Sequence, residues 1–304
     1  MDQLVQSWIG MELRQLRYVD AVARHRHFTR AAADVGIAQP ALSHQVKRLE
    51  QELGVELFRR SRAGVSLTEA GAAFLPHVRR ALLAVDAGRE ELTALAGLRV
   101  GRVRLGAMQA LGRLDLAAAI GAFHARHPGV EVTLSEESTA DMYRLLAEGQ
   151  LDLALVALDL NPPQGIEAAA LQREPVLLAL PQGHPLAAGP AVAFSALRDQ
   201  PFVMFRPGTG LRATAERASR AAGFQPLVAF ETGNLDRMLA LVAQRLGVAP
   251  IPASSVRGGR PGLGFRPLAP ALTRTVGLAH RAEQPLAPAA RALRAQLLDA
   301  AGGG

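Results

Sequence analysis

The sequence predicts an α/β protein in three parts: a bundle of short N-terminal helices, one long helix, and a C-terminal region of alternating strands and helices. Three observations predict this organisation. Apolar residues recur every three or four positions between Leu13 and Leu53, which is typical of amphipathic helices. A single helical pattern runs from Thr68 to about Ala96. Beyond Gly97–Arg102, short apolar runs typical of strands alternate with helical segments.

Length and composition restrict the class of protein. The chain has 304 residues, of which 49% are hydrophobic and 20% charged, and this suits a soluble globular protein of two or three domains. It has no cysteine, which excludes disulfides and thiolate metal sites. No apolar run approaches the roughly 18–20 residues of a membrane helix, and Met1–Gly10 lacks the pattern of a signal peptide. We therefore expect a cytoplasmic protein with no membrane partner.

The net charge of +7 permits nucleic-acid binding but does not locate it, because the basic residues are spread along the chain. Local clusters must indicate where a polyanion binds. The segment between the first helix, expected at Leu13–Val22, and Gly54 has the most informative local pattern.

The second and third helices have the spacing of a helix-turn-helix. Thr29 is the expected N-cap for Arg30–Val35, and Gly36 is expected to end that helix in the left-handed conformation. Pro40 lies in the first turn of the third helix, where a missing N–H costs least. These features predict a helix-turn-helix at about Phe28–Lys47.

One face of the third helix carries side chains suited to base edges and phosphates. If Leu42, Val46 and Leu49 face inward, the opposite face presents polar and basic groups. The candidate DNA contacts in the two helices are Thr29, Arg30, Gln39, Pro40, Ser43, His44 and Lys47. The alternative is a plain three-helix bundle with a solvated polar face, which the agreement of turn, spacing and polar face disfavours.

A short hairpin is expected after the third helix. Val55–Phe58 and Val65–Thr68 are expected strands on either side of an arginine-rich turn, Arg59–Gly64. Such a hairpin beside a helix-turn-helix predicts a winged helix. Its arginines would hold phosphates or enter the minor groove, positioning the protein more than specifying sequence. They are Arg59, Arg60 and Arg62. A merely solvated loop is the alternative.

Several blocks of sequence resemble the LysR-type transcriptional regulators. They are MELRQLRYV from Met11, FTRAA from Phe28, AQPALSHQV from Ala38, LEQELGVELF from Leu49 and LTEAG from Leu67. The resemblance continues more loosely almost to the C-terminus. Arginine is common in the family where this chain has His44, so we expect a different DNA contact there. The family's usual start corresponds to Met11, so we expect residues 1–10 to be an N-terminal extension, with a misassigned start at Met1 as the alternative.

The pattern after Thr68 predicts a linker helix that pairs with a second chain. Pro76 is expected to cost this helix one backbone hydrogen bond, and Arg89 interrupts its apolar seam. The seam has a heptad-like spacing: Val78, Leu82, Val85 and Leu92. Packing on the same chain is the alternative. The resemblance implies a homodimer, often within a homotetramer, and two-fold symmetry then implies a dyad-symmetric operator.

The remaining chain predicts a parallel α/β sheet. The expected strands are Val103–Gly106, Val130–Leu134, Leu151–Leu158, Val176–Leu180, Pro201–Phe205, Leu227–Glu231 and Val276–His280. The expected helices are Leu114–His127, Ala140–Glu148, Leu211–Gly223, Asn234–Arg245 and Pro288–Asp299. The run Arg257–Gly264 is expected to be a loop.

The resemblance implies that this region is a two-lobed effector-binding domain similar to type 2 periplasmic binding proteins. We expect four segments: the extension at 1–10, the winged helix-turn-helix at 11–68, the linker helix at 69–97 and the effector-binding domain at 98–304. Within the last, lobe I covers about 100–172 and 276–304, and lobe II covers about 173–275.

Turns that follow strands are the candidate effector contacts, because ligands in such folds bind at strand ends beside helix N-termini. The candidates are Met108, Gln109, Ser138, Thr139, Phe205, Arg206, Thr209, Thr232 and Asn234. Helix capping alone is the alternative, above all for Thr139 and Asn234. The family commonly has serine or threonine where Met108 and Gln109 stand, which predicts a more apolar or differently shaped ligand.

The sequence indicates no enzymatic, metal or cofactor site. Gly208–Gly210 lacks the following lysine of a phosphate loop and the spacing of a dinucleotide fingerprint. The histidine pairs at 25/27 and 124/127 lack companion ligands, and no serine lies in a nucleophile elbow. We predict a sequence-specific DNA-binding transcriptional regulator controlled by a small-molecule effector, for which a carboxylate is one candidate, with RNA polymerase as a candidate partner. The alternatives are a ligand-independent repressor, a solute-binding protein and an enzyme on an α/β scaffold.

Overall fold

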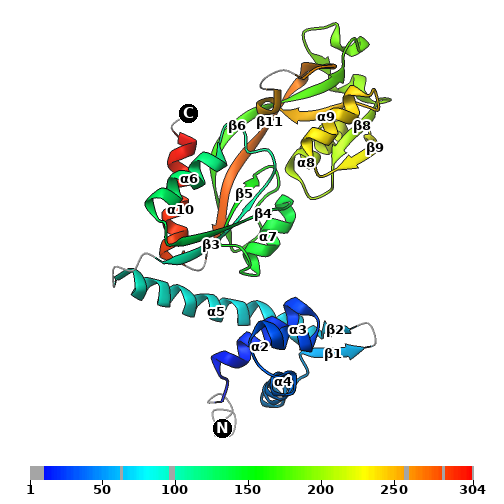
Figure 1. Cartoon of the computed structure of the whole chain (residues 1–304). Helices are drawn as coiled ribbons and strands as arrows, with labels where there is room; N and C mark the ends of the chain where they lie inside the picture. The colour runs from blue at the N-terminus through cyan, green and yellow to red at the C-terminus, as the bar shows by residue number, and fades with distance from the viewer. Residues whose placement is uncertain (1–9, 62–63, 96–99, 257–259, 283–284, 303–304) are drawn as a thin grey trace. The chain divides into compact units, whose positions relative to one another are not determined.

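The computed structural model describes residues 10–61, 64–95, 100–256, 260–282 and 285–302 (Figure 1). The chain divides into two compact units, Met1–Leu92 and Thr93–Gly304, and each is described by itself. Among the helices of the described residues, none combines the length and the apolar character needed to cross a membrane.

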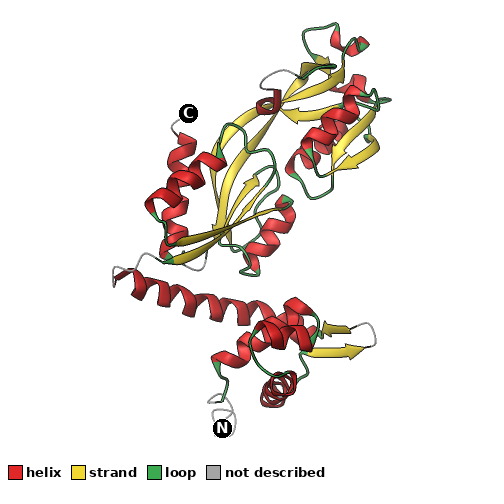
Figure 2. Ribbon diagram, viewed as in Figure 1, coloured by secondary structure: helices red, strands yellow, loops and turns green. Residues whose placement is uncertain are grey.

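The N-terminal unit contains a helix-turn-helix, a hairpin and most of the long helix (Figure 2). Its elements are α2 (Leu13–His25), α3 (Phe28–Asp34), α4 (Gln39–Leu53), β1 (Phe58–Ser61), β2 (Gly64–Leu67) and α5 (Glu69–Leu95). Gly36 and Gly54 follow α3 and α4 with φ of 70° and 71°, the left-handed conformation expected after each helix. The predicted winged helix-turn-helix is thus confirmed.

The cap of α3 differs from the prediction. The side chain of His27, not of Thr29, caps the helix: its Nδ1 accepts a hydrogen bond from the Thr29 N–H at 3.2 Å. Phe28 is buried at the first helical position, so the helix begins before Thr29. A histidine ring nitrogen here takes the place that a hydroxyl oxygen usually occupies.

The hairpin also begins later than predicted. Strand β1 starts at Phe58, and Arg59 and Arg60 therefore lie within it, opposite Ser66 and Val65. The physical reason is Glu50, whose Oε1 accepts the N–H groups of residues 57 and 58 at 2.8 and 3.1 Å. These bonds hold the chain against α4 before the ladder starts. Arg62 lies outside the described residues.

Helix α5 confirms the predicted long helix, and Pro76 lies inside it. The predicted seam is divided between two environments. Val78 is buried and Leu82 half-buried in the core of the helix-turn-helix, so the first part of the seam packs on its own chain. Val85 and Leu92 are 39% and 69% exposed. Only this second part is left for a partner chain to cover.

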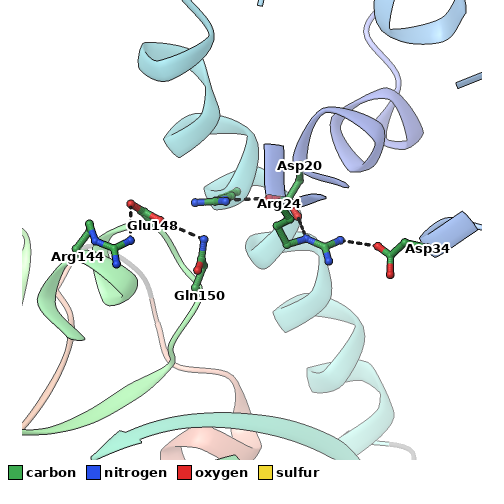
Figure 3. Close-up of polar contacts among 7 residues, drawn as sticks. Asp20, Arg24, Asp34, Arg144, Glu148 and Gln150 are labelled. Atoms are coloured by element: carbon green, nitrogen blue, oxygen red, sulfur yellow. Dashed lines mark hydrogen bonds and ion pairs between the residues drawn. The ribbon is translucent and has the colours of Figure 1, made fainter. Parts of the chain in front are cut away.

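An ion-pair network joins three helices of this unit. The Asp20 carboxylate of α2 forms ion pairs with two arginines. Its Oδ1 lies 2.9 Å from Nε of Arg79 in α5, and its Oδ2 lies 3.0 Å from Nε of Arg24 in α2. Arg24 also contacts Asp34 at the end of α3, at 2.9 Å (Figure 3). The hydrogen bond from Arg24 lowers the pKa of Asp34. The network holds the first half of α5 against α2 of the helix-turn-helix unit.

The second unit contains nine strands and five α-helices within the described residues. The strands are β3 (Gly101–Ala107), β4 (Val130–Glu136), β5 (Leu153–Ala157), β6 (Ile166–Pro181), β7 (Val192–Ala193), β8 (Pro201–Phe205), β9 (Leu227–Thr232), β10 (Ala249–Pro252) and β11 (Leu263–Arg281). The helices are α6 (Leu116–Arg126), α7 (Thr139–Ala147), α8 (Gly210–Ala221), α9 (Leu235–Ala243) and α10 (Pro288–Gly302). Short 3-10 turns lie at Pro185–Ala187, Phe194–Leu197 and Ala253–Val256.

The main sheet is mixed, which corrects the predicted parallel sheet. Its order is β10-β6-β11-β5-β3-β4, with β7 beside β11. Strand β3 pairs in parallel with β4 and β5, but β11 runs antiparallel to β5 and β6, and β10 antiparallel to β6. The antiparallel partners are long strands of 16 and 19 residues. Sequence patterns detected only their apolar ends, because charged residues and prolines interrupt the rest.

The predicted loop Arg257–Gly264 is also partly wrong. Leu263 and Gly264 belong to β11 and pair with Pro181 and Leu180 of β6. Residues 257–259 lie outside the described residues.

The two long strands β6 and β11 pass through both lobes of this unit (Figures 1 and 2). We call lobe I the part built on β3, β4, β5, α6, α7 and α10, and lobe II the part built on β8, β9, β10, α8 and α9. In lobe I, Leu153 and Leu155 of β5 pack with α6 and α10, while Ala154 and Val156 pack with α7. Lobe II has its own core around Phe202. The predicted two-lobed α/β architecture is confirmed.

Candidate functional site

Helix α4 presents one apolar and one polar face. Leu42, Val46 and Leu49 are buried in the helix-turn-helix core. On the opposite side, Pro40, His44 and Lys47 are exposed, and Gln39 and Ser43 are half-buried. We call these five residues the reading face: Gln39, Pro40, Ser43, His44 and Lys47.

Exposed polar and basic side chains lie on the two elements next to α4 in the chain. Thr29 and Arg30 are exposed in the first turn of α3, and Arg59 and Arg60 are exposed on β1. Arg60 contacts α4 directly, since its Nη2 donates to Ser43 Oγ at 2.7 Å. Its guanidinium carbon also lies 4.1 Å from the centroid of the Phe28 ring. A polar face bordered by arginine and lysine suits the base edges and phosphates of DNA.

A cavity of about 340 Å³ lies between lobe I and lobe II of the second unit. Seven of the nine predicted effector contacts line it: Met108, Gln109, Ser138, Thr139, Phe205, Arg206 and Thr209. The remaining two do not. Asn234 caps α9 through a hydrogen bond from Arg237 N–H at 2.9 Å, and buried Thr232 accepts the Asn234 N–H at 3.1 Å. The capping alternative therefore holds for Asn234, and Gly233 between them lines the cavity instead.

On the lobe I side, the amino end of α7 forms the cavity wall. Ser138 caps the helix by accepting the Asp141 N–H at 3.1 Å, and its hydroxyl donates to Asp141 Oδ2 at 2.7 Å. The Ser138 hydrogen bond and the Arg144 guanidinium hold the pKa of Asp141 below its usual value. Thr139 is 1% exposed, and its Oγ1 accepts the Ala157 N–H at 3.2 Å. The cap predicted for Thr139 thus belongs to Ser138.

The same helix ends in a second group of charged residues. Arg144 contacts Glu148 at 3.4 Å, and Glu148 accepts the side-chain amide of Gln150 at 3.1 Å (Figure 3). These contacts hold the turn that leads into β5, which lies away from the cavity lining.

Two hydrogen bonds join the lobes beside the cavity. Gln109, in the turn after β3, accepts the Leu235 N–H at the amino end of α9 through its Oε1, at 3.1 Å. The Ala140 N–H of α7 donates to the Gly208 carbonyl at 3.1 Å. Gly210 and Ala157 also come so close that a Cβ on Gly210 would lie 2.2 Å from the Ala157 Cβ. The lobes are therefore in direct contact beside the cavity.

Gln109 borders a second cavity as well. This cavity has a volume of about 480 Å³ and shares Met108, Gln109, Ala110 and Glu136 with the first. Its other lining is largely apolar: Ala107, Leu111, Leu114, Leu116, Ala117, Ile120, Leu134 and Leu235. The Gln109 side chain thus lies where the two parts of the inter-lobe space meet.

Most of the charged residues of the first cavity lie outside the predicted set. Arg274 lines it and is 3% exposed, but its Nε and Nη2 donate to Glu174 at 2.9 and 2.6 Å, and Nη2 also donates to the Ala110 carbonyl. Glu136, Glu137 and Asp141 add three carboxylates. Arg206 lies at the start of the turn between β8 and α8 and is exposed. The lining therefore carries both positively and negatively charged side chains.

Family models match both units of the chain. Residues 13–72 match the bacterial regulatory helix-turn-helix protein, lysR family, and residues 96–302 match the LysR substrate binding domain. The chain belongs to the LysR family. The resemblance seen in the sequence is confirmed, and so is the function it implies. This LysR protein is a DNA-binding transcriptional regulator with an effector-binding domain, and its family consists of regulators, not enzymes.

Curated relatives of this LysR regulator match over most of their length. The chain is 35% identical to the transcriptional dual regulator GltC of Bacillus subtilis (strain 168) over 282 residues, which are 92% of this chain and 94% of that protein. It is 34% identical to the regulator BudR of Raoultella terrigena over 268 residues, 87% and 92% of the two chains.

Solved structures agree with the fold. Full-length OxyR C199D from Pseudomonas aeruginosa is 28% identical, with a TM-score of 0.71 over 95% of this chain and 97% of that one. Full-length CbnR complexed with its target DNA has 23% identity and a TM-score of 0.62, over 95% and 100% of the two chains, and shows the shared fold.

Sequence reasoning missed four charged lining residues of this LysR regulator. Glu136, Glu137 and Asp141 lie next to the predicted Ser138 and Thr139, so their place on the turn was a signal that could have found them. Arg274 had no local signal. It lies in the middle of β11, and only the antiparallel pairing with β6 brings it beside Glu174 and the turn at Ala110.

Proposed function

We propose that two copies of this LysR regulator read a dyad-symmetric operator, and that a small molecule between lobes I and II changes that binding. The observation that carries the proposal is the inter-lobe cavity, which borders Gln109 and lies beside hydrogen bonds that join the two lobes. A ligand in such a cavity favours one arrangement of the lobes over another, and that preference is the energy available for regulation.

The proposed DNA contacts are the reading face and the basic groups around it. Exposure of His44 and Lys47, together with the burial of Leu42 and Val46, supports α4 as the helix that enters the major groove. The full set is Thr29, Arg30, Gln39, Pro40, Ser43, His44, Lys47, Arg59, Arg60 and Arg62.

The exposed half of the α5 seam supports a homodimer, or a homotetramer built from it. Val85 and Leu92 are large apolar residues exposed on one helix, and a second α5 would remove them from water. Two-fold pairing presents two reading faces to two half-sites about one helical turn of DNA apart, or a multiple of it. Bound there, in the cytoplasm, the dimer can recruit or block RNA polymerase.

The proposed effector contacts are the predicted residues that line the cavity, together with Glu136 and Arg274. An effector with a carbonyl or carboxylate oxygen can take the Leu235 N–H that Gln109 now occupies, because an exposed helix N-terminus favours such an oxygen. Glu136 and Glu137 favour a molecule that also carries hydrogen-bond donors or a cationic group. A monocarboxylate without such donors or a cationic group would leave Glu136 and Glu137 without a contact to the ligand.

The test combines footprinting with a ligand screen. DNase I footprinting on the DNA upstream of the protein's own gene should show protection of two symmetric half-sites. Thermal-shift screening against a panel of amino acids, keto acids and aromatic acids should find a ligand that raises the Tm of the second unit and alters the footprint. A footprint that no member of the panel changes favours the ligand-independent repressor. The absence of any protected dyad contradicts the proposal.

A further inference from the structure

One side chain joins the wing to the recognition helix α4. Arg60 lies on β1, where its backbone is held opposite Val65 in the β1–β2 ladder. Its Nη2 donates to Ser43 Oγ at 2.7 Å, across seventeen positions of sequence. An arginine of the wing therefore contacts the middle of the reading face.

The guanidinium of Arg60 is held in place by an aromatic ring. Its central carbon lies 4.1 Å from the centroid of the Phe28 ring, within the range of a cation–π contact. Phe28 is itself buried, and its ring meets the ring of Phe58 edge to face at 6.1 Å. The guanidinium plane thus rests on the core of the helix-turn-helix. A group held in this way loses little conformational entropy when it binds.

We infer that Arg60 acts with Ser43 as a single base-reading unit, and so determines sequence preference instead of supplying only phosphate attraction. The inference rests on the proposed placement of α4 in the major groove. The bond to Ser43 engages one of the five N–H donors of the guanidinium. It also occupies one acceptor position of the Ser43 hydroxyl, which leaves the hydrogen and the remaining lone pair of that oxygen for a base. Removal of Arg60 therefore changes what Ser43 reads.

Arg59 supplies the matched control. It is the neighbouring residue on the same strand and pairs with Ser66, so its side chain lies on the opposite face of the hairpin. It has the same charge and is also exposed. A contact with phosphates alone predicts the same effect for both arginines, whereas a reading unit with Ser43 predicts different ones.

The experiment measures discrimination with the full-length protein. Fluorescence anisotropy gives the Kd for the footprinted operator fragment and for a scrambled duplex of equal length, at one salt concentration. The variants are Arg60→Ala, Arg60→Lys, Ser43→Ala, the Ser43→Ala/Arg60→Ala double variant and Arg59→Ala. A melting curve of each variant shows whether it is folded. If Arg60→Ala does not fold, Arg60→Lys still tests the inference, because it keeps the charge and the aliphatic part of the side chain.

The expected result is a loss of preference confined to one arginine. Arg60→Ala and Ser43→Ala should each lower the ratio of specific to scrambled affinity about five- to hundredfold, the range for one base-reading contact. The double variant should lose no more than about twofold beyond the larger single loss, because interacting residues are not additive. Arg60→Lys should keep its affinity for scrambled DNA and lose the preference. Arg59→Ala should weaken both duplexes alike.

Two results overturn the inference. One is an Arg60→Ala or Arg60→Lys variant that binds both duplexes more weakly by the same factor, as Arg59→Ala does. The other is a double variant whose loss is the product of the two single losses. A wild-type protein that does not prefer the footprinted fragment contradicts a different claim, the proposed function itself.

Discussion

The reading face and the inter-lobe cavity are built in opposite ways. The reading face lies on α4 beside the adjacent elements α3 and β1, and its contact with β1 joins Ser43 to Arg60. The cavity is built from turns far apart in sequence, and its contacts join Gln109 to Leu235 and Ala110 to Arg274. A surface built from elements that are neighbours in the chain can be predicted from local sequence patterns. A cavity closed by long-range contacts depends on strand pairing that local patterns do not contain.

The largest expected effect is on the cavity. Arg274→Met leaves Glu174 buried beside its remaining partner, the Ser254 N–H. Removing one member of a buried ion pair costs about 3–5 kcal/mol, because the other charge loses its compensation. Hydrogen exchange of peptides from β6 and β11 should accelerate, while peptides from α4 keep their rates.

The control for this prediction is the double variant Arg274→Met/Glu174→Leu. It removes both charges and should recover most of the lost protection. Equal acceleration of hydrogen exchange in α4 peptides would contradict the prediction, because it would mean that losing the ion pair destabilises both units.

The second effect is on the reading face. Ser43→Ala should cost roughly 1–3 kcal/mol at the operator, as expected for one base contact. Ligand-induced shifts in Tm should stay unchanged, since no residue of the reading face lines the cavity. Ser66→Ala, the same change on the exposed wing strand, serves as control and should leave operator affinity within about twofold. An equal loss for both serines contradicts the assignment.

A third effect concerns the cap of α7. Ser138→Ala removes the acceptor of the Asp141 N–H and should cost about 0.5–2 kcal/mol of stability. It also removes the main cause of the lowered Asp141 pKa. A carboxylate whose pKa is lowered in the folded state adds stability above its unfolded pKa of about 3.9, and this contribution is lost as the pH falls through the folded value.

The difference in unfolding free energy between wild type and Ser138→Ala should therefore begin to shrink as the pH falls below the unfolded pKa of about 3.9, and it should keep shrinking as the pH falls through the lower pKa of folded Asp141. Urea unfolding at pH 7 and pH 3.5 measures it. Ser138→Thr keeps the hydroxyl and should behave like the wild type. A difference that grows on acidification would refute this explanation.

The smallest effect concerns the bridge between the lobes. Gln109→Ala removes the acceptor of the Leu235 N–H, a contribution of about 0.5–1.5 kcal/mol. Amide exchange at the amino end of α9 should rise by the corresponding factor of about 2 to 12. Gln244→Ala, at the exposed carboxyl end of the same helix, is the control. Unchanged exchange in Gln109→Ala would show that the bridge does not hold the lobes.

The sequence allowed most of the fold to be predicted, because the apolar periodicity of α4 and the left-handed glycines after α3 and α4 are local signals. It misplaced the start of β1, since the Glu50 carboxylate that delays the ladder is set by tertiary contact. It missed most of β6 and β11 because their charged residues, Glu174 and Arg274, satisfy each other only after the strands pair. The turns that line the cavity could be predicted because ligands in such folds bind at strand ends. Arg274 could not, because it lies in the middle of a strand.

Selection of bound duplexes from a random DNA pool tests the central claim most directly. The wild-type protein should enrich an inverted repeat whose half-site centres lie about 10 base pairs apart, or a multiple of that distance, as two reading faces of a symmetric dimer require. Ser43→Ala should lose preference at one position within each half-site and keep the spacing. Enrichment without a dyad, or an identical motif from Ser43→Ala, would contradict the account.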